Sequence, residues 1–329
     1  MSSTGTSSLP GVAPTVDAPF GRRVSAGSGL WKLRTYSAPY LFLLPYFLVT
    51  AVFFIYPLCY ATILAFKQTA GPTRSAYVGL SNFSFILHDP DFYTALWNTI
   101  VFTLSSICIQ LPLSLGLAML LNSRKDRLKG FFRLALFSPN LVGQVFVGIL
   151  FMMLLAPRYG LFNQFLHALF GKPLGWQLLE TNWRQVPSLV MPAIVIASLW
   201  LWVGFNMIYF LAALQNVDQS QIEAARIDGA GPGNVFLHVT LPAIAPVTTF
   251  VVITSTIGSF QLFELPYTLL EQGFGPKDSG LTIVGYLYNQ GINTGDFGMG
   301  AAVGWILTFI ILFVSLVQIR ISGTARRDA

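Results

Sequence analysis

The sequence predicts an all-α polytopic membrane protein with six transmembrane helices, and three observations lead to that prediction. Hydrophobic residues make up 54% of the 329 residues and charged residues only 10%, against about 25% charged in a soluble domain. The apolar residues gather in long runs that meet or approach the ~20 residues needed to cross a bilayer. Short polar segments separate these runs, which lie near 40–66, 95–121, 134–155, 187–213, 242–263 and 300–319.

The segment before the first run is rich in Ser, Gly and Pro and has no apolar stretch long enough for a signal-peptide core. We therefore expect residues 1–35 to be a disordered tail. Residues 30–36, at its end, mix basic and aromatic side chains, as a short helix in the lipid headgroup layer does. Residues 36–322 are then expected to form one six-span domain, and 323–329 a C-terminal tail.

Proline residues inside four of the runs predict kinked spans. They are Pro45, Pro57, Pro112, Pro192 and Pro246. Between the third and fourth spans, residues 161–170 are too few to cross a bilayer, but their apolar residues recur at helical spacing. We expect a short helix there, on the outer surface.

The distribution of basic residues predicts the orientation of the spans. The two tails, the 122–133 loop and the loop between the fourth and fifth spans hold thirteen of the 19 Lys and Arg residues, and the opposite loops hold six. Because Lys and Arg are enriched on the cytoplasmic side, both termini are expected to be cytoplasmic. The basic residues form no single patch, so the net charge of +6 does not indicate a nucleic-acid partner.

No catalytic or metal-binding pattern is apparent in the sequence. Cys59 and Cys108 both lie in apolar runs, where a disulfide or a metal site is not expected. The chain has no Gly-x-x-x-x-Gly-Lys-Ser/Thr phosphate loop and no nucleophile with its base. We therefore expect a transport component with no cofactor of its own, and not an enzyme.

The cytoplasmic loop at 215–241 contains a predicted short helix. Ser220 and Glu223 have the spacing of a capping box, Ala224 and Ala225 favour a helix, and Gly229 should end it. A helix this short needs support from a partner surface. Periodicity leaves two interpretations equally open, which are a connector packed on its own bundle and a helix that docks on another protein.

This loop resembles the signature loop of permeases from binding-protein-dependent ABC importers. The resemblance rests on Glu223-Ala224-Ala225, Asp228-Gly229-Ala230 and Leu241-Pro242, and it extends over 40–320. It is strongest for the carbohydrate-uptake branch, in the member that pairs with a second permease. Further matches lie at 40–45, 78–83 and 273–276. Gly231-Pro232-Gly233 departs from the usual bulky residues, and Phe274 interrupts the usual glycine turn.

The resemblance implies the type I ABC importer permease fold, located in the inner membrane. It also implies partners: a second, homologous permease, a dimer of ATPase subunits that binds ATP and Mg, an extracytoplasmic solute-binding protein, a sugar-like solute and membrane lipid. In this family the loop couples the permease to the ATPase. The coupling residues are then Glu223, Ala224, Ala225, Asp228 and Gly229.

Polar side chains inside the fourth and fifth spans are the candidates for a solute path, because polar groups in a membrane interior are costly and usually face the bundle. Amides beside aromatic rings suit sugars, which present hydroxyls and apolar ring faces. Most Ser and Thr residues of these spans are interpreted as packing residues, and Trp200 and Trp202 as facing lipid or a neighbouring subunit. The resemblance places the sugar site in these spans and so selects Gly204, Phe205, Asn206, Gly258, Ser259, Gln261 and Phe263.

Two other function classes were weighed against a sugar importer. A secondary transporter that works without ATP would need charged residues inside the spans, and acidic residues there are nearly confined to the ends. A membrane enzyme would need a catalytic cluster. An ABC permease for a non-sugar solute stays open, although a phosphate ester is disfavoured because the fourth and fifth spans contain no Lys or Arg.

Overall fold

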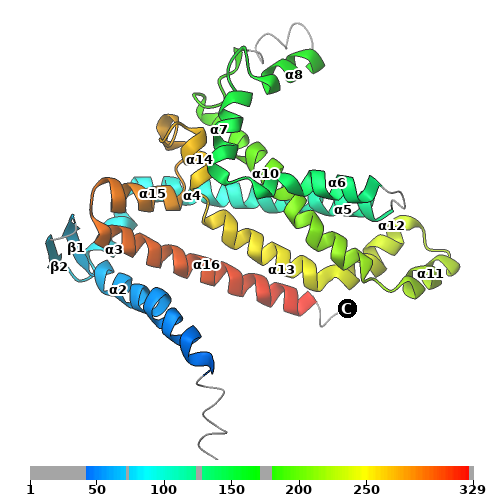
Figure 1. Cartoon of the computed structure of the whole chain (residues 1–329), viewed down its shortest axis with the longest axis horizontal. Coiled ribbons are helices and arrows are strands. Elements are labelled where there is room, and N and C mark those ends of the chain that lie inside the picture. The colour runs from blue at the N-terminus through cyan, green and yellow to red at the C-terminus, as the bar shows by residue number, and fades with distance from the viewer. Residues whose placement is uncertain (1–41, 72–73, 124–127, 171–179, 326–329) are drawn as a thin grey trace, which may run out of the picture. The chain divides into compact units, whose positions relative to one another are not determined.

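The computed structural model describes residues 42–71, 74–123, 128–170 and 180–325, and it confirms a predominantly helical membrane fold (Figure 1). Within these residues, five helices are long and apolar enough to cross a membrane, and a bent helix pair makes a sixth span if its two halves count as one. The five are Phe42–Ala65, Pro90–Ser123, Pro187–Gln215, Pro232–Phe260 and Phe297–Gly323. The headgroup helix expected at 30–36 lies outside the described residues.

The contacts divide the chain into two compact units, Met1–Leu58 and Cys59–Ala329. In chain order the elements are η1 (Ala51–Ile55), α2 (Tyr56–Ala65), β1 (Lys67–Ala70), β2 (Arg74–Tyr77), α3 (Ser81–His88), α4 (Pro90–Ser105), η2 (Ser106–Gln110), α5 (Leu111–Ser123), α6 (Leu128–Phe137), η3 (Ser138–Leu141), α7 (Gln144–Leu154), α8 (Leu161–Phe170), α10 (Pro187–Gln215), α11 (Gln219–Ile227), α12 (Pro232–Val235), η4 (Phe236–Thr240), α13 (Leu241–Phe260), α14 (Glu264–Leu269), η5 (Pro276–Asp278), α15 (Ile283–Tyr288), η6 (Asn289–Asn293) and α16 (Phe297–Ala325).

The described residues include a short β-hairpin that the all-α prediction did not contain. Strands β1 and β2 pair antiparallel, with Lys67 opposite Tyr77. One carboxylate oxygen of Asp296 accepts hydrogen bonds from the backbone N–H and the hydroxyl of Thr69, at 3.0 and 3.1 Å. A Cβ on Gly298 would lie 1.8 Å from the carbonyl oxygen of Lys67. Glycine at this position therefore lets the hairpin pack directly against the first turn of α16.

The third predicted span, 134–155, is not one continuous helix. The segment Leu128–Leu141 and the segment Gln144–Leu154 meet at an angle of 99°. Pro139 lies in the 3₁₀ turn that ends the first segment, and Gly143 adopts an extended conformation before α7. Because proline and an extended residue both interrupt helical hydrogen bonding, the chain turns sharply here.

The fifth span also differs from the prediction of 242–263. It begins ten residues earlier, at Pro232, with Gly231 as the residue that precedes the helix. Proline suits the first turn of a helix because its missing N–H would have no partner there. The span passes through the π-turn η4 before Pro242 and ends at Phe260, so Gln261 follows the helix rather than lying in it.

Helix α10 is the centre of the second unit. It packs against α5, α6 and α13, and α13 in turn packs against α16 (Figure 1). Half of its most apolar stretch is buried, although it is hydrophobic on all sides. A helix of this kind belongs in the interior of a bundle. The segments that surround α10 form the walls of the site described next.

Candidate functional site

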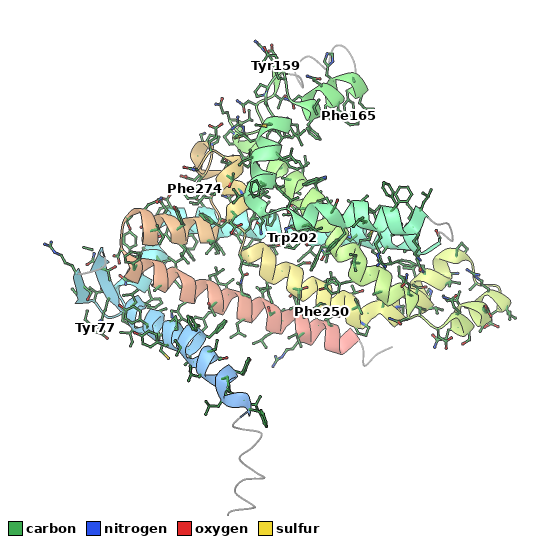
Figure 2. The ribbon with its side chains drawn as sticks, viewed as in Figure 1. Tyr77, Tyr159, Phe165, Trp202, Phe250 and Phe274 are labelled. Carbon is green, nitrogen blue, oxygen red and sulfur yellow. The ribbon has the colours of Figure 1, made fainter. Side chains whose placement is uncertain are left out.

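A cavity of about 280 Å³ opens where α10 passes α13 and the second span. Figure 2 shows Trp202, one of its lining residues, near the middle of this region. Helix α10 contributes Ser198, Trp202, Phe205 and Asn206, and α13 with the residues after it contributes Thr254, Ser255, Gly258, Ser259, Gln261 and Leu262. The remaining wall comes from α4, η2 and α7, through Phe102, Ser106, Gln110 and Gln144. These lining residues carry amides, hydroxyls and aromatic rings, and none is ionisable.

The structure brings together five of the seven residues predicted for the solute path. Phe205, Asn206, Gly258, Ser259 and Gln261 all line the cavity. Asn206 is 5% exposed, and its side-chain amide makes no hydrogen bond with any described residue. Because this amide lines the cavity and has no partner among the described residues, it is available to a molecule in the cavity.

Gly204 is on α10 but does not line the cavity. A Cβ at this position would lie 1.7 Å from the carbonyl oxygen of Leu136, at the end of α6. No side chain fits at that distance, and Gly204 therefore allows α10 and α6 to touch through their backbones. By contrast, a Cβ on Gly258 would meet nothing within 4 Å, because that glycine faces open space.

Phe263 also lies outside the cavity lining. It follows Leu262, which does line it, and it belongs to a small aromatic group. Its ring centroid is 5.0 Å from that of Tyr267, in a stacked arrangement, and 4.9 Å from that of Tyr288. Phe263, predicted to contact the sugar, therefore packs against neighbouring rings of this chain.

Sequence reasoning missed the wall formed by the second and third spans. Ser106, Gln110 and Gln144 were not among the candidates. Ser198, Thr254 and Ser255 were interpreted as packing residues, and Trp202 as facing lipid or a neighbouring subunit. The same signal that identified Asn206, an amide inside a long apolar run, is present at Gln110. The resemblance, however, places the sugar site in the fourth and fifth spans, and Gln110 lies in the second.

The predicted cytoplasmic helix is present as α11, with a different N-terminal cap. Asp218, and not Ser220, is the capping residue, and its carboxylate accepts a hydrogen bond from the backbone N–H of Ser220 at 2.9 Å. Hydrogen bonds from Ser220 lower the pKa of Asp218. Because a lowered carboxyl pKa favours the folded helix above the ordinary Asp pKa, this contribution is present at neutral pH and is lost only as the pH falls through the lowered value.

The C-terminus of α11 ends at a glycine cap, as predicted. Gly229 has a φ of +84°, and its N–H bonds the carbonyl of Arg226. The N–H of Ala230 bonds the carbonyl of Ala225 at 2.9 Å. This pair of bonds satisfies the last carbonyls of a helix and requires the left-handed conformation that glycine adopts most easily.

The surface of α11 is largely exposed. None of its residues is buried; Glu223 and Ala224 are exposed, as are Asp228 and Gly229 just beyond it, and Ala225 is half-buried. Ile227 is 86% exposed, which is unusual for a large apolar side chain on a short polar helix. The helix therefore presents the five predicted coupling residues and an apolar side chain to its surroundings.

The described residues contain no group of three or more His, Cys, Asp or Glu side chains that could hold a metal ion. A helical membrane domain with a central uncharged cavity and an exposed helix between two spans is the arrangement of a membrane permease. The chain belongs to the family of binding-protein-dependent transport system inner membrane components, whose model matches residues 91–323.

Several relatives are similar over most of the chain. It is 40% identical to the arabinooligosaccharides transport system permease protein AraP of Bacillus subtilis (strain 168), over 91% of this chain and 93% of that protein. It is 36% identical to the lactose transport system permease protein LacF of Rhizobium radiobacter, over 85% and 92%. It is 32% identical to the sn-glycerol-3-phosphate transport system permease protein UgpA of Yersinia pestis, over 86% and 92%.

The same fold occurs in a solved structure. A chain of the bacterial alginate ABC transporter, in complex with alginate pentasaccharide-bound periplasmic protein, superposes with a TM-score of 0.76 at 20% identity and covers 91% of this chain and 99% of that one. The chain is thus a multi-pass membrane permease component with the ABC importer fold.

Proposed function

We propose that this chain is one permease subunit of an ATP-driven, binding-protein-dependent importer that carries an uncharged sugar or related polyol into the cytoplasm. The main support for this proposal is the cavity, because its wall combines the amides of Asn206 and Gln261 with the aromatic rings of Trp202 and Phe205. Amides bond hydroxyl groups and rings cover apolar sugar faces. The names of the relatives, which include arabino-oligosaccharide and lactose permeases, support the same class of solute.

The uncharged wall favours neutral solutes over acidic ones. A phosphate or carboxylate taken into a membrane interior needs a cationic or hydrogen-bonded partner, because desolvation of an unpaired charge is very unfavourable. The described residues that line the cavity include no Lys, Arg or His. We therefore favour an uncharged oligosaccharide over glycerol 3-phosphate, although a relative at 32% identity is named for that ester.

The exposed surface of α11 supports the assignment of the ATPase to another subunit. A nine-residue helix has little stability by itself, and this one leaves Ile227 uncovered. We propose that Glu223, Ala224, Ala225, Asp228 and Gly229 dock on one subunit of an ATPase dimer, which binds ATP and Mg. A second, homologous permease and an extracytoplasmic solute-binding protein complete the proposed complex.

Transport by the reconstituted complex tests the proposed function. The permease is purified with its partners and placed in vesicles that contain ATP, and uptake of radiolabelled arabinotriose, lactose and sn-glycerol 3-phosphate is compared. We expect ATP-dependent uptake of at least one neutral sugar and none of the ester. Uptake of the ester alone would contradict the solute class, and sugar uptake that needs no ATP would indicate a secondary transporter.

A further inference from the structure

The second span carries a stripe of buried polar residues that faces the bundle. The members recur every three or four residues, which places them on one side of the span formed by α4, η2 and α5. They are Thr99, Thr103, Ser106, Gln110 and Ser114, and each is at most 5% exposed.

Three members of the stripe have hydrogen-bond partners within the protein. The hydroxyl of Thr99 donates to the carbonyl of Ala95 and accepts from the N–H of Ile283. The hydroxyl of Thr103 donates to the carbonyl of Thr99 at 2.8 Å. Ser114 lies 2.7 Å from the carbonyl of Gln110 and 3.0 Å from that of Val203 on α10. The hydroxyl groups of these three residues are therefore already hydrogen-bonded within the protein.

The two middle members differ from the others. Ser106 and Gln110 are 3% and 4% exposed, and their side chains make no hydrogen bond with any described residue. They are also the two members of the stripe that line the cavity. Because their polar side chains line the cavity and have no partner among the described residues, a polar group inside the cavity is the natural partner for both.

The local backbone explains why these two side chains share one wall. Ser106 and Gln110 are the first and last residues of the π-turn η2, which packs against both α10 and α13. A π-turn widens one turn of a helix and changes the direction of the side chains that follow, and such turns are frequent at functional sites. Here the turn lies at the cavity, where it packs against the two helices that carry Asn206 and Ser259.

From this placement we infer that Ser106 and Gln110 form a third solute-binding wall, which bonds hydroxyl groups of the transported sugar. The inference rests on the proposed function and adds the second span to the two spans that sequence reasoning selected. Gln110 offers two N–H donors and one oxygen acceptor, and Ser106 offers a hydroxyl that serves either way. An uncharged polyol satisfies both.

Transport kinetics test the inference in the complete importer. Gln110→Met keeps the length of the side chain and removes its polar groups, and Ser106→Ala removes the hydroxyl. For radiolabelled arabinotriose or lactose, whichever the wild type imports, we expect Gln110→Met to raise the apparent KM about tenfold or more and Ser106→Ala by a smaller factor. Ser114→Ala is the matched control, because Ser114 is equally buried but bonds backbone carbonyls, and its KM should be unchanged.

Chemical labelling gives a second measurement that does not depend on kinetics. Cys59 and Cys108 are exposed free thiols, so both are first changed to serine. Ser106→Cys is then introduced, and its reaction with a small maleimide is followed with and without the imported sugar. We expect the sugar to slow labelling, while Ile109→Cys, on the 49% exposed side of the same turn, should be unaffected.

The outcomes separate this inference from the proposed function. Suppose that the wild-type complex imports a neutral sugar, but Gln110→Met retains its KM and the sugar does not protect Ser106→Cys. The proposed role of Ser106 and Gln110 is then wrong, while the proposed importer function still holds. If the wild-type complex imports no neutral sugar, the proposed function and the third wall are both wrong. A rise in KM together with protection supports the inference.

Discussion

At the scale of single residues, two glycines in neighbouring spans have opposite surroundings, and this contrast gives the first prediction. Gly204→Ala would place a methyl group 1.7 Å from the carbonyl oxygen of Leu136, whereas Gly258→Ala meets nothing within 4 Å. Overpacking of this kind destabilises by about 1–3 kcal/mol. We expect Gly204→Ala to lower the thermal unfolding temperature of the purified permease and Gly258→Ala to leave it unchanged. Equal unfolding temperatures for the two variants would show that α6 and α10 separate easily.

The second prediction concerns the two amides in the proposed solute path. Asn206 is almost fully buried, while Gln261 is exposed just beyond the end of α13. Loss of a buried hydrogen bond costs about 1–3 kcal/mol, or roughly a tenfold to hundredfold loss of affinity. Asn206→Leu should therefore raise the apparent KM by that factor, and Gln261→Leu by less, because water can replace what is lost there. Unchanged transport by both variants would place the solute site elsewhere, in the partner permease first of all.

Single residues could be predicted from the sequence where a polar side chain lies in an otherwise apolar span. Asn206 was predicted because it is an amide in an apolar helix. The same rule applies to Gln110, but that residue lies in the second span, outside the two spans in which the solute path was expected. The place of Gly204 could not be predicted, since glycine in a span serves equally for close packing and for open space. Only the position of Leu136, 68 residues away in the chain, decides between these roles.

At the scale of elements, α11 gives the third prediction. Gly229→Asp puts a side chain at a φ of +84°, whereas Gly233→Asp, near the start of the next helix, puts the same side chain at a glycine with an ordinary φ and nothing within 4 Å. We expect Gly229→Asp and the exposed-site variant Glu223→Ala to leave the permease in the membrane but to reduce solute-stimulated ATPase activity of the complex sharply. Gly233→Asp should retain that activity. Normal transport by the first two variants would make α11 a simple connector.

The elements themselves were predictable where hydrophobic runs are long and unbroken, as in α10 and α16. The third span was not, because 134–155 is apolar on both sides of Gly143, and hydropathy does not register a change of direction. The cap of α11 was assigned to Ser220 because a capping box fits there. Asp218 lies two residues earlier, and its carboxylate accepts a hydrogen bond from the N–H of Ser220. The helix therefore begins at Gln219, and Ser220 lies inside its first turn instead of capping it.

At the scale of the whole molecule, the basic residues predict the topology of the chain. The excess of Lys and Arg in the tails and in the 122–133 loop should keep these segments in the cytoplasm. Reporters fused after residue 329 and within 122–133 should read as cytoplasmic, and a reporter near residue 171 as external. The three positions provide controls for one another. A C-terminal reporter outside the cell would refute the six-span arrangement.

The uncharged cavity wall has an electrical consequence. One elementary charge that crosses a membrane held at 100 mV changes the free energy by about 2.3 kcal/mol, so a carrier of charged solutes is driven or opposed by the voltage. A neutral sugar held by amides and hydroxyls carries no charge through that field. Uptake should therefore keep its rate when an ionophore collapses the membrane potential at constant ATP, and a fall under those conditions would mean that an ion travels with the solute.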